Sequence, residues 1–438
     1  MARALRRAAV SLLLLAAAWA ADTRALTILH TNDLHARISP DINRQGGFAL
    51  LAAVLRRETD GCNSCLVLNA GDLVQGTPAS SLTQGQLIFD LANMLRFDAA
   101  TLGNHDLDYG FERTRDFIKS ANYPIVTANL ADAAGKLLTP EPYVIKTVNG
   151  IRVAIIGAML TRLLDNSIKT LIGPYQVLPV AGTVRKYAKE VRDKSDFIVV
   201  LGHLDAADQF AILRGVPEVN VLVTGHNHAG LPVPNAYKGR IDVRVKAYGL
   251  EIGRLAMKVD VSARKLKSWT WNRIPIDGHF VAPAPDVAAQ VDAWEKKFAV
   301  MVDLPVGEAK REFARGELRT VLESAMAESS AADIGFMNAG GVRDRLAKGR
   351  ILIRDLWNVM PFENRIVLVR FKGAELGQLA KAGREIDPAR DYTIAMPDFV
   401  AEHQEAHLGA TGRIFPQKDG GLVRDALIEW VKKKRVLQ

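Results

Sequence analysis

The chain has 438 residues, of which 48% are hydrophobic and 24% charged, and its formal net charge is +9 at pH 7. This length indicates two or three domains of globular protein, and no long biased segment or internal repeat interrupts it. No dense basic stripe with aromatic residues accompanies the positive charge, which argues against nucleic acid as a partner. A modest positive balance instead favours a small anionic substrate.

The first 20 residues predict a secretory signal peptide. Arg3, Arg6 and Arg7 precede the apolar run AAVSLLLLAAAWA, which ends in a small-residue triplet typical of a cleavage site. A membrane anchor is the alternative, but an apolar run of about 14 residues is shorter than the roughly 20 that span a bilayer. We therefore expect a periplasmic or secreted mature protein without a membrane span. The Arg6-Arg7 pair leaves the general and the twin-arginine export routes open.

The two cysteines, Cys62 and Cys65, lie in the short stretch GCNSC. An exported protein meets oxidising conditions, which favours a local disulfide. Free thiols and redox chemistry remain alternatives. A zinc site would need two more ligands nearby, and the sequence shows none there.

Residues 25–280 alternate between short apolar runs and amphipathic helices. The runs LTILHT, CLVLN, AATLG, RVAIIGAML, FIVVLG and VNVLVTG predict strands, and FALLAAVLRRE and QLIFDLANMLRF predict helices. This alternation predicts an α/β architecture with a largely buried sheet. Residues 281–303 predict a linker helix that opens in the Pro-rich stretch VAPAP, and residues 304–438 predict a second, smaller α/β domain.

Ionisable side chains follow the apolar runs of the first domain at equivalent places. Five of the nine histidines belong to this set, which consists of Asp33, His35, Asp72, Asn104, His105, His203, His226 and His228. Turn-forming tendency explains any one of these loops, but it gives no reason for their equivalent positions. Ligand sites of α/β folds lie beyond the carboxyl ends of strands. We expect His30, inside the first strand, to be a satisfied core residue, and His279, His403 and His407 not to be ligands.

Carboxylate, imidazole and amide oxygen together suit divalent transition metals. The five motifs Asp33-x-His35, Gly71-Asp72, Gly103-Asn104-His105-Asp106, Gly202-His203 and Gly225-His226-x-His228 offer more ligands than one ion needs. Two ions that share one carboxylate would use them all. Paired metal ions are a standard device for the hydrolysis of phosphate esters.

The five motifs, in this order, resemble those of the calcineurin-like metallophosphoesterases. More narrowly, ILHTNDLHA, LNAGDLVQGTP and TLGNHDLDYG are similar to the bacterial 5′-nucleotidase and UDP-sugar hydrolase family, which includes animal ecto-5′-nucleotidase. The resemblance implies a metallophosphatase domain over residues 25–280, built as a four-layer β-sandwich flanked by helices. A helix at 281–303 would join it to a 5′-nucleotidase-type substrate domain over residues 304–438.

The resemblance also implies roles for the residues of the first domain. One ion would be held by Asp33, His35, Asp72 and His228, and the other by Asp72, Asn104, His203 and His226. Asp72 would bridge the two ions, for which Mn, Zn, Co and Fe all remain open. His105 and Asp108 match the catalytic pair of the family, and Asp106 is interpreted as a helix-start residue.

In the second domain, the stretch NAGGVR resembles the substrate loop of the family. The matching positions are Asn338, Gly340, Gly341 and Arg343, and Arg311 matches a further arginine. Guanidinium groups suit an anionic substrate because they pair with phosphate through two hydrogen bonds. Phe362 and Phe399 match two aromatic residues that sandwich a nucleobase. For each of these residues alone, a surface or core role is the alternative.

One departure concerns the ribose. Relatives carry a Gly-Gly-Asp-Gly stretch after the second Phe, whose Asp binds ribose, whereas this chain reads VAEHQEAHLGATGRIF, and Asp398 is not at the matching place. The favoured function is an exported two-metal phosphohydrolase that releases phosphate from nucleoside 5′-monophosphates, with UDP-sugars as further substrates. The alternatives are a 2′,3′-cyclic phosphodiesterase with 3′-nucleotidase activity, a thiosulfohydrolase, and a non-catalytic anion-binding protein.

Overall fold

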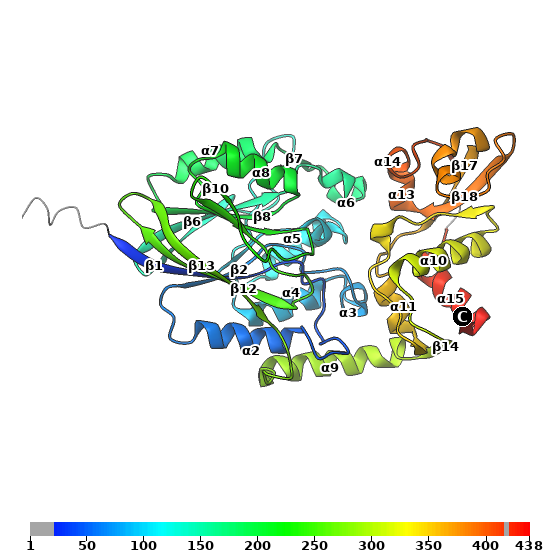
Figure 1. Cartoon of the computed structure of the whole chain (residues 1–438), viewed down its shortest axis with the longest axis horizontal. Coiled ribbons are helices and arrows are strands. Elements are labelled where there is room, and N and C mark those ends of the chain that lie inside the picture. The colour runs from blue at the N-terminus through cyan, green and yellow to red at the C-terminus, as the bar shows by residue number, and fades with distance from the viewer. Residues whose placement is uncertain (1–21, 416–419) are drawn as a thin grey trace, which may run out of the picture.

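A computed structural model describes residues 22–415 and 420–438 of the chain (Figure 1). The predicted signal peptide at residues 1–20 lies outside the described residues. In the described part of the chain, no helix combines the length and the apolarity that a membrane crossing requires.

Two β-sheets face each other in the larger, N-terminal part of the molecule (Figure 1). The first has the strand order β13-β12-β1-β2-β3 and consists of β1 (Thr23–Thr31), β2 (Cys65–Asn69), β3 (Ala99–Ala100), β12 (Glu251–Asp260) and β13 (Lys265–Pro275). The second has the order β10-β11-β9-β8-β6-β5 and consists of β5 (Tyr143–Val148), β6 (Ile151–Met159), β8 (Phe197–His203), β9 (Val221–Gly225), β10 (Asn235–Tyr237) and β11 (Arg240–Val243).

The central strands are buried on both faces, which explains their continuous apolar sequences. Ile28 and Val199 lie in the core between the sheets, while their neighbours Leu29 and Val200 face helices on the two outer sides. One outer face is covered by α2 (Phe48–Thr59), α3 (Pro78–Leu82), α4 (Gln86–Ala92), α5 (Phe111–Ser120) and α9 (Pro285–Val302). The other is covered by α7 (Val180–Val191) and α8 (Ala206–Gly215). The predicted four-layer arrangement is confirmed.

Short elements connect these layers. They are η1 (Asn93–Leu95), η2 (Asn104–Leu107), β4 (Leu130–Ala131), η3 (Leu163–Asp165), α6 (Lys169–Ile172) and β7 (Gln176–Val177). Helix α9 runs along the edge of the larger part toward the smaller one (Figure 1). It begins at Pro285, whose fixed φ suits the first helical position. An ion pair of 2.7 Å between Arg56 and Asp286 fastens α9 to α2.

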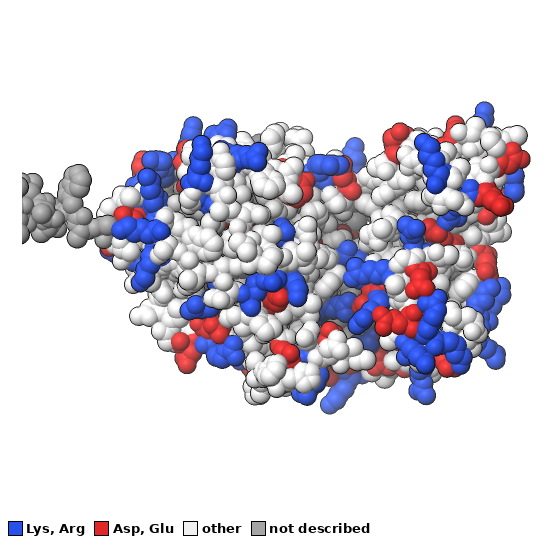
Figure 2. Space-filling view, in the orientation of Figure 1, with Lys and Arg blue, Asp and Glu red and all other residues white. Residues whose placement is uncertain are grey.

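The smaller, C-terminal part is a second α/β unit with its own apolar cores. Its sheets have the orders β16-β14-β20 and β15-β18-β17-β19, with β14 (Pro305–Ala309), β15 (Ile334–Gly335), β16 (Gly349–Leu352), β17 (Ile366–Lys372), β18 (Asp391–Pro397), β19 (Arg413–Ile414) and β20 (Val436–Leu437). Its helical elements are α10 (Arg315–Ser330), η4 (Ala339–Gly341), α11 (Ile353–Val359), η5 (Gly373–Glu375), α12 (Gly377–Lys381), α13 (Asp398–Glu402), α14 (Gln404–Leu408) and α15 (Val423–Lys434). On the face in Figure 2, both parts carry Lys and Arg next to Asp and Glu.

Cys62 and Cys65 form a disulfide with an S–S distance of 1.98 Å. The bond closes the turn between α2 and β2, which decides between the alternatives that the sequence left open.

His30 is buried in β1 as predicted, but the prediction that its polar groups are satisfied is wrong. Neither ring nitrogen has a hydrogen-bond partner among the described residues. The ring stacks on Trp271 at 5.5 Å, and Gly253 leaves the space for it, since a Cβ there would lie 2.2 Å from the imidazole. Burial lowers the pKa of His30 to about 3, so the ring is a neutral core group.

Candidate active site

The predicted ligands lie at one edge of the two sheets because the strands that precede them are parallel neighbours. In the first sheet Thr31 pairs with Asn69, so Asp33 and Asp72 follow adjacent strand ends. In the second sheet β8 and β9 are parallel neighbours, and His203 ends β8 beside the last residue of β9. Side chains that are far apart in sequence therefore meet in one place.

Four of these ligands have backbone conformations that are unusual for residues with side chains. Asp33, His35, Asp72 and His226 have φ values of 52°, 48°, 54° and 78°. Such left-handed conformations cost free energy and cluster at functional sites. Hydrogen bonds between the loops hold them, because the amides of Asp33 and His35 donate to the carbonyls of Gly71 and Asp72 at 3.0 Å each.

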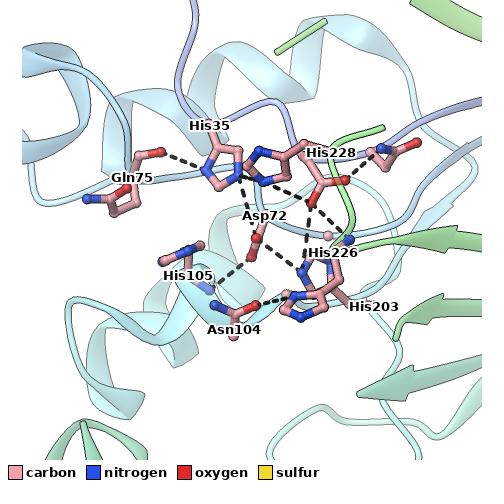
Figure 3. A network of polar contacts seen from close by, with 12 residues as sticks. His35, Asp72, Gln75, Asn104, His105, His203, His226 and His228 are labelled. Carbon is pink, nitrogen blue, oxygen red and sulfur yellow. Dashed lines mark hydrogen bonds and ion pairs between the residues drawn. The ribbon is translucent and has the colours of Figure 1, made fainter. Parts of the chain in front are cut away.

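The first group of ligands contains Asp33, His35 and His228, whose ligand atoms all lie within 4.8 Å of one another. The Nε2 atoms of His35 and His228 are 3.0 Å apart. Oδ2 of Asp72 lies 3.7 Å from His35 Nε2. Asp72 therefore faces this first group, and it also faces the second group described next (Figure 3).

The second group contains Asp33, Asp72 and His203, again within 4.8 Å of one another. Oδ2 of Asp72 lies 3.1 Å from Nε2 of His203. His226 and Asn104 lie next to this group, with Nδ1 of His226 at 3.1 Å from Oδ1 of Asn104. Figure 3 shows Asp72 between the two sets of histidines, which is the place that a bridging carboxylate needs.

Hydrogen bonds on the outer side of the rings turn the inner nitrogens toward the centre. Nδ1 of His35 donates to the carbonyl of Gln75 at 3.0 Å, and Nδ1 of His203 donates to the carbonyl of Ala70 at 2.9 Å. This fixes the tautomer in which Nε2 is the free ligand atom. His203 Nε2 is buried and makes no well-formed hydrogen bond within the described part, as expected of a nitrogen that ligates a cation.

The other histidine of the first group, His228, is held by Tyr248. The Tyr248 hydroxyl lies 3.2 Å from Nδ1 of His228, and the Tyr248 amide donates to the carbonyl of Asp33 at 2.7 Å. Arg37 lies over the tyrosine ring at 5.1 Å. Tyr248 thus connects two ligands with a surface arginine, and no local sequence pattern pointed to this role.

The charge balance of the site suits cations. Burial lowers the pKa of His226 to about 4 and that of His228 to about 3, so both rings are neutral at neutral pH and offer a lone pair. Burial opposes protonation of His203 too, but Asp72 and Asp33 raise its pKa to about 9. A proton on His203, or a divalent cation next to it, would balance the negative charge of the two carboxylates. The donor set of carboxylates, imidazoles and an amide fits two divalent ions, consistent with the prediction.

His105 and Asp108 form the predicted pair at the rim of the cluster. Nδ1 of His105 lies 2.8 Å from Oδ2 of Asp108, and the His105 amide donates to Oδ1 of Asp72 at 2.9 Å. Burial opposes protonation of the imidazole, but the carboxylates of Asp108 and Asp72 outweigh it and raise the pKa of His105. The pair is therefore arranged to hold a proton beside the ligands.

Asp106 has a larger part than the predicted helix start. Its buried carboxylate accepts four backbone hydrogen bonds, from Gly103 at 2.8 Å, Asp72 at 3.0 Å, Leu73 at 3.0 Å and Val74 at 3.2 Å. Asp106 therefore ties the loop that carries Asp72 to the loop that carries His105 and Asp108. The position of Asp106 among the predicted ligands could have indicated this role. A helix-start residue explained the same aspartate equally well.

A cavity of about 390 Å³ lies between the two parts of the chain. The N-terminal part lines it with Asp72, Gln75, Asn104, His105, Asp108, Tyr109, Asn166, Ser167, Ile168, Thr170, Leu171, His226 and His228. The C-terminal part lines it with Asn338, Gly340, Gly341, Arg343, Pro361, Phe362, Glu363, Asn364, Arg365, Asp398 and Phe399. The predicted substrate loop and both predicted aromatic residues thus line the same cavity as several predicted metal ligands. Nη2 of Arg343 lies 3.4 Å from Nε2 of His35.

Arg311 is the predicted substrate-binding residue that the structure does not bring to the cavity. Its side chain is exposed, forms a 2.7 Å ion pair with Glu317 and lies 4.2 Å over the ring of Phe313. Arg311 precedes α10, and its pair with Glu317 in the first turn of that helix lies at the surface. Arg365 lines the cavity, and the sequence reasoning missed it because it lies outside the recognised loops.

Comparisons with known proteins agree with this geometry. The family described as calcineurin-like phosphoesterase matches residues 26–230, and the family described as 5′-nucleotidase, C-terminal domain, matches residues 300–382. The chain belongs to the 5′-nucleotidase family of calcineurin-like metallophosphoesterases. As a member of this family it is a metal-dependent phosphoester hydrolase.

Several curated relatives align along most of this chain. Protein UshA of Yersinia enterocolitica is 25% identical over 88% of this chain and 82% of its own length. A 5′-nucleotidase of Vibrio cholerae is 26% identical over 82% of this chain and 75% of its own length. Endonuclease YhcR of Bacillus subtilis is 26% identical over 84% of this chain, which spans only 34% of that protein.

Two solved structures have the same fold as this chain. The 5′-nucleotidase precursor of Thermus thermophilus superposes with a TM-score of 0.83 at 22% identity, covering 95% of this chain and 97% of the other. The sulfate thiohydrolase SoxB of the same organism superposes with a TM-score of 0.82 at 15% identity, covering 94% of each chain. Since proteins with different named activities share this fold, the fold alone does not name the substrate.

Proposed function

We propose that this protein is an exported phosphohydrolase that uses two divalent ions to release phosphate from nucleoside 5′-monophosphates, with UDP-sugars as further substrates. The observation that carries the proposal is the position of Arg343, whose guanidinium lies 3.4 Å from the ring of His35. A phosphate group in the cavity would meet the metal ligands on one side and this guanidinium on the other. Guanidinium groups bind phosphate with two parallel hydrogen bonds.

The proposal divides the chain by task. Residues 25–280 would hold the ions, residues 281–303 would form the linker, and residues 304–438 would select the substrate. Residues 1–20 would direct export. One ion would be held by Asp33, His35, Asp72 and His228, and the other by Asp72, Asn104, His203 and His226. Bound ions of this kind polarise phosphoryl oxygens and lower the pKa of water.

The remaining steps belong to side chains of this protein. Arg343 would bind and orient the phosphoryl oxygens. His105 would donate a proton to the leaving oxygen or stabilise charge on the phosphate, and Asp108 would keep its ring in position through the 2.8 Å contact at Nδ1. Phe362 and Phe399 line the cavity and would stack on the base.

The names of the relatives support a nucleotide as the substrate. The missing ribose-binding aspartate is also compatible with another phosphate ester. Asp398 lines the cavity, but its Oδ1 already accepts hydrogen bonds from Asn364 at 2.7 Å and from the Phe399 amide at 2.8 Å. The carboxylate of Asp398 is thus partly committed within the protein. We expect weak recognition of the sugar hydroxyls.

Hydrolysis by purified mature protein tests the proposal. It is followed as inorganic phosphate for the two monoesters and as the mononucleotide, sugar phosphate or p-nitrophenol released from the other esters. The substrates are AMP, 3′-AMP, 2′,3′-cyclic AMP, UDP-glucose and bis-p-nitrophenyl phosphate, each with added Mn or Zn. We expect AMP to have the highest kcat/KM, chelators to abolish turnover, and Mn, Co or Zn to restore it. Asp72→Ala should reduce activity more than Asn104→Ala, because both ions would depend on Asp72. Full turnover by protein shown to be metal-free would refute the two-metal mechanism, and a preference for the cyclic ester would replace the proposed substrate.

A further inference from the structure

The side-chain amide of Gln75 is buried at the cavity wall without a partner. Gln75 lines the cavity and is only 2% exposed, yet neither its amide nitrogen nor its amide oxygen makes a hydrogen bond within the described part of the chain. An amide offers two donors and an acceptor, and leaving all of them unpaired is costly. An unpaired group of this kind in a binding cavity requires an explanation.

The backbone of Gln75 is fixed from both sides. Its backbone N–H donates to Oγ of Ser80 at 2.9 Å, and its backbone carbonyl accepts the hydrogen bond from Nδ1 of His35. Its φ of 67° lies in the left-handed region, which Gly and Asn adopt more readily than Gln. The backbone conformation therefore does not explain why this residue is a glutamine. Gly or Asn could make the same two backbone hydrogen bonds.

The surroundings of the amide indicate which ligand it would meet. Figure 3 shows the backbone carbonyl of Gln75 directed at His35, while the side-chain amide is turned away from Asp72. The side-chain amide is therefore not a further metal ligand. The ring of His35 also neighbours Arg343 at 3.4 Å and the ring of His105 at 5.3 Å between centroids. The guanidinium of Arg343 carries donors and no acceptor, so its position in the same cavity matches an anion rather than a hydroxyl.

We propose that Gln75 is a substrate-binding residue whose amide nitrogen donates a hydrogen bond to an oxygen of the phosphoryl group. The inference rests on the proposed function only in requiring a phosphoryl group in this cavity. It does not depend on the nucleoside part of the substrate. Gln75 is then kept unpaired in the free protein because its partner arrives with the substrate.

The test compares Gln75→Met with the control Gln84→Met in metal-loaded protein. Methionine keeps the length of the side chain and removes both polar atoms. Gln84 is the same residue type, also has a positive φ of 46°, and is exposed. The readouts are binding of inorganic phosphate by calorimetry, kcat/KM for AMP and p-nitrophenyl phosphate, metal content, and the melting temperature.

For Gln75→Met we expect phosphate affinity and both kcat/KM values to fall about 10- to 100-fold, the range of a hydrogen bond to a charged group. Metal content should stay at the wild-type level, and the melting temperature should stay equal or rise, because an unpaired buried amide is removed. Gln84→Met should leave all four readouts unchanged.

Unchanged phosphate affinity would overturn the proposal, as would loss of metal or a loss confined to AMP. If Gln75→Met does not fold, Gln75→Asn replaces it, since Asn accepts the left-handed backbone and withdraws the amide by one methylene. We expect the same fall in phosphate affinity for Gln75→Asn. Failure of the wild type to hydrolyse AMP would refute the nucleotide substrate alone, because the phosphate measurement involves no nucleoside.

Discussion

The guanidinium of Arg343 lies 3.4 Å from the imidazole of His35, although the two residues are 308 positions apart and belong to different parts of the chain. The next residue, Asp344, forms a 2.6 Å ion pair with Arg37, which itself lies over the ring of Tyr248. The loop that carries Arg343 is therefore fastened beside the predicted metal ligands through Arg37, which also contacts Tyr248.

Loss of the Arg37–Asp344 ion pair should weaken substrate binding without affecting the metal site. For Asp344→Asn we expect KM for AMP to rise about two- to fivefold, as usual for a partly exposed pair, while kcat and metal content stay near wild type. Arg37→Gln should have the same effect, and the double variant should be no worse than either single one. The exposed Arg345–Glu312 pair offers the control Glu312→Gln, which should change nothing. Additive losses in the double variant would mean that the two residues act independently.

His105 should act on the rate of reaction rather than on metal binding. We expect His105→Gln to lower kcat by roughly 10²- to 10⁴-fold, the contribution of a positioned acid or base. Asp108→Asn should cost less, because Asp108 only orients the ring. Steady-state kinetics and elemental analysis of the same preparations provide the check. Loss of metal together with activity would reclassify His105 as a ligand.

Tyr248 should control the affinity for one ion of the two. Tyr248→Phe keeps the ring under Arg37 and the amide bond to Asp33, but it removes the hydroxyl at 3.2 Å from His228. Partners of metal-bound histidines typically contribute about 10- to 100-fold in affinity. Metal titration of the apoprotein should therefore show one weakened site and one unchanged site.

The control for Tyr248 is Tyr123→Phe, which removes a buried hydroxyl that has no hydrogen-bond partner among the described residues. Both titration steps should remain as in the wild type. Equal weakening of both sites by Tyr248→Phe would show that the hydroxyl supports the fold of the whole cluster.

The sequence predicted which side chains gather at the sheet edge, because each lies in a short motif at the end of a strand. Asp33 and His203 are placed by local chain geometry, and the parallel strands bring such ends together. Tyr248 and Gln75 were missed as functional residues because their roles depend on which side chain packs against them. Arg311 was expected at the cavity because its motif matched, yet its side chain lies at the surface in a pair with Glu317. Sequence motifs therefore predicted residues whose position follows from their own loop. The positions of Tyr248, Gln75 and Arg311 depend on tertiary packing, which the motifs do not contain.

Phe362 should contribute to binding of the base and not to binding of the phosphate. Phe362 lines the cavity with its ring 5.7 Å from that of His105, and Arg343 lies 5.7 Å over it. Stacking on a base contributes about 1–3 kcal/mol, so Phe362→Ala should lower kcat/KM for AMP about tenfold or more. p-Nitrophenyl phosphate should be nearly unaffected, because its phosphate meets the metal ligands and Arg343 in both proteins.

The same measurement on dAMP tests the missing ribose contact. Each hydrogen bond to a sugar hydroxyl contributes about 0.5–1.5 kcal/mol, so a site without the aspartate of the family should prefer AMP over dAMP by no more than about tenfold. A preference of a hundredfold or more would show that another residue binds the sugar, and Asp398→Asn would then be the variant to examine. Equal losses on AMP, dAMP and p-nitrophenyl phosphate in Phe362→Ala would assign Phe362 to the core that it packs against, and the base-stacking role would fall with it.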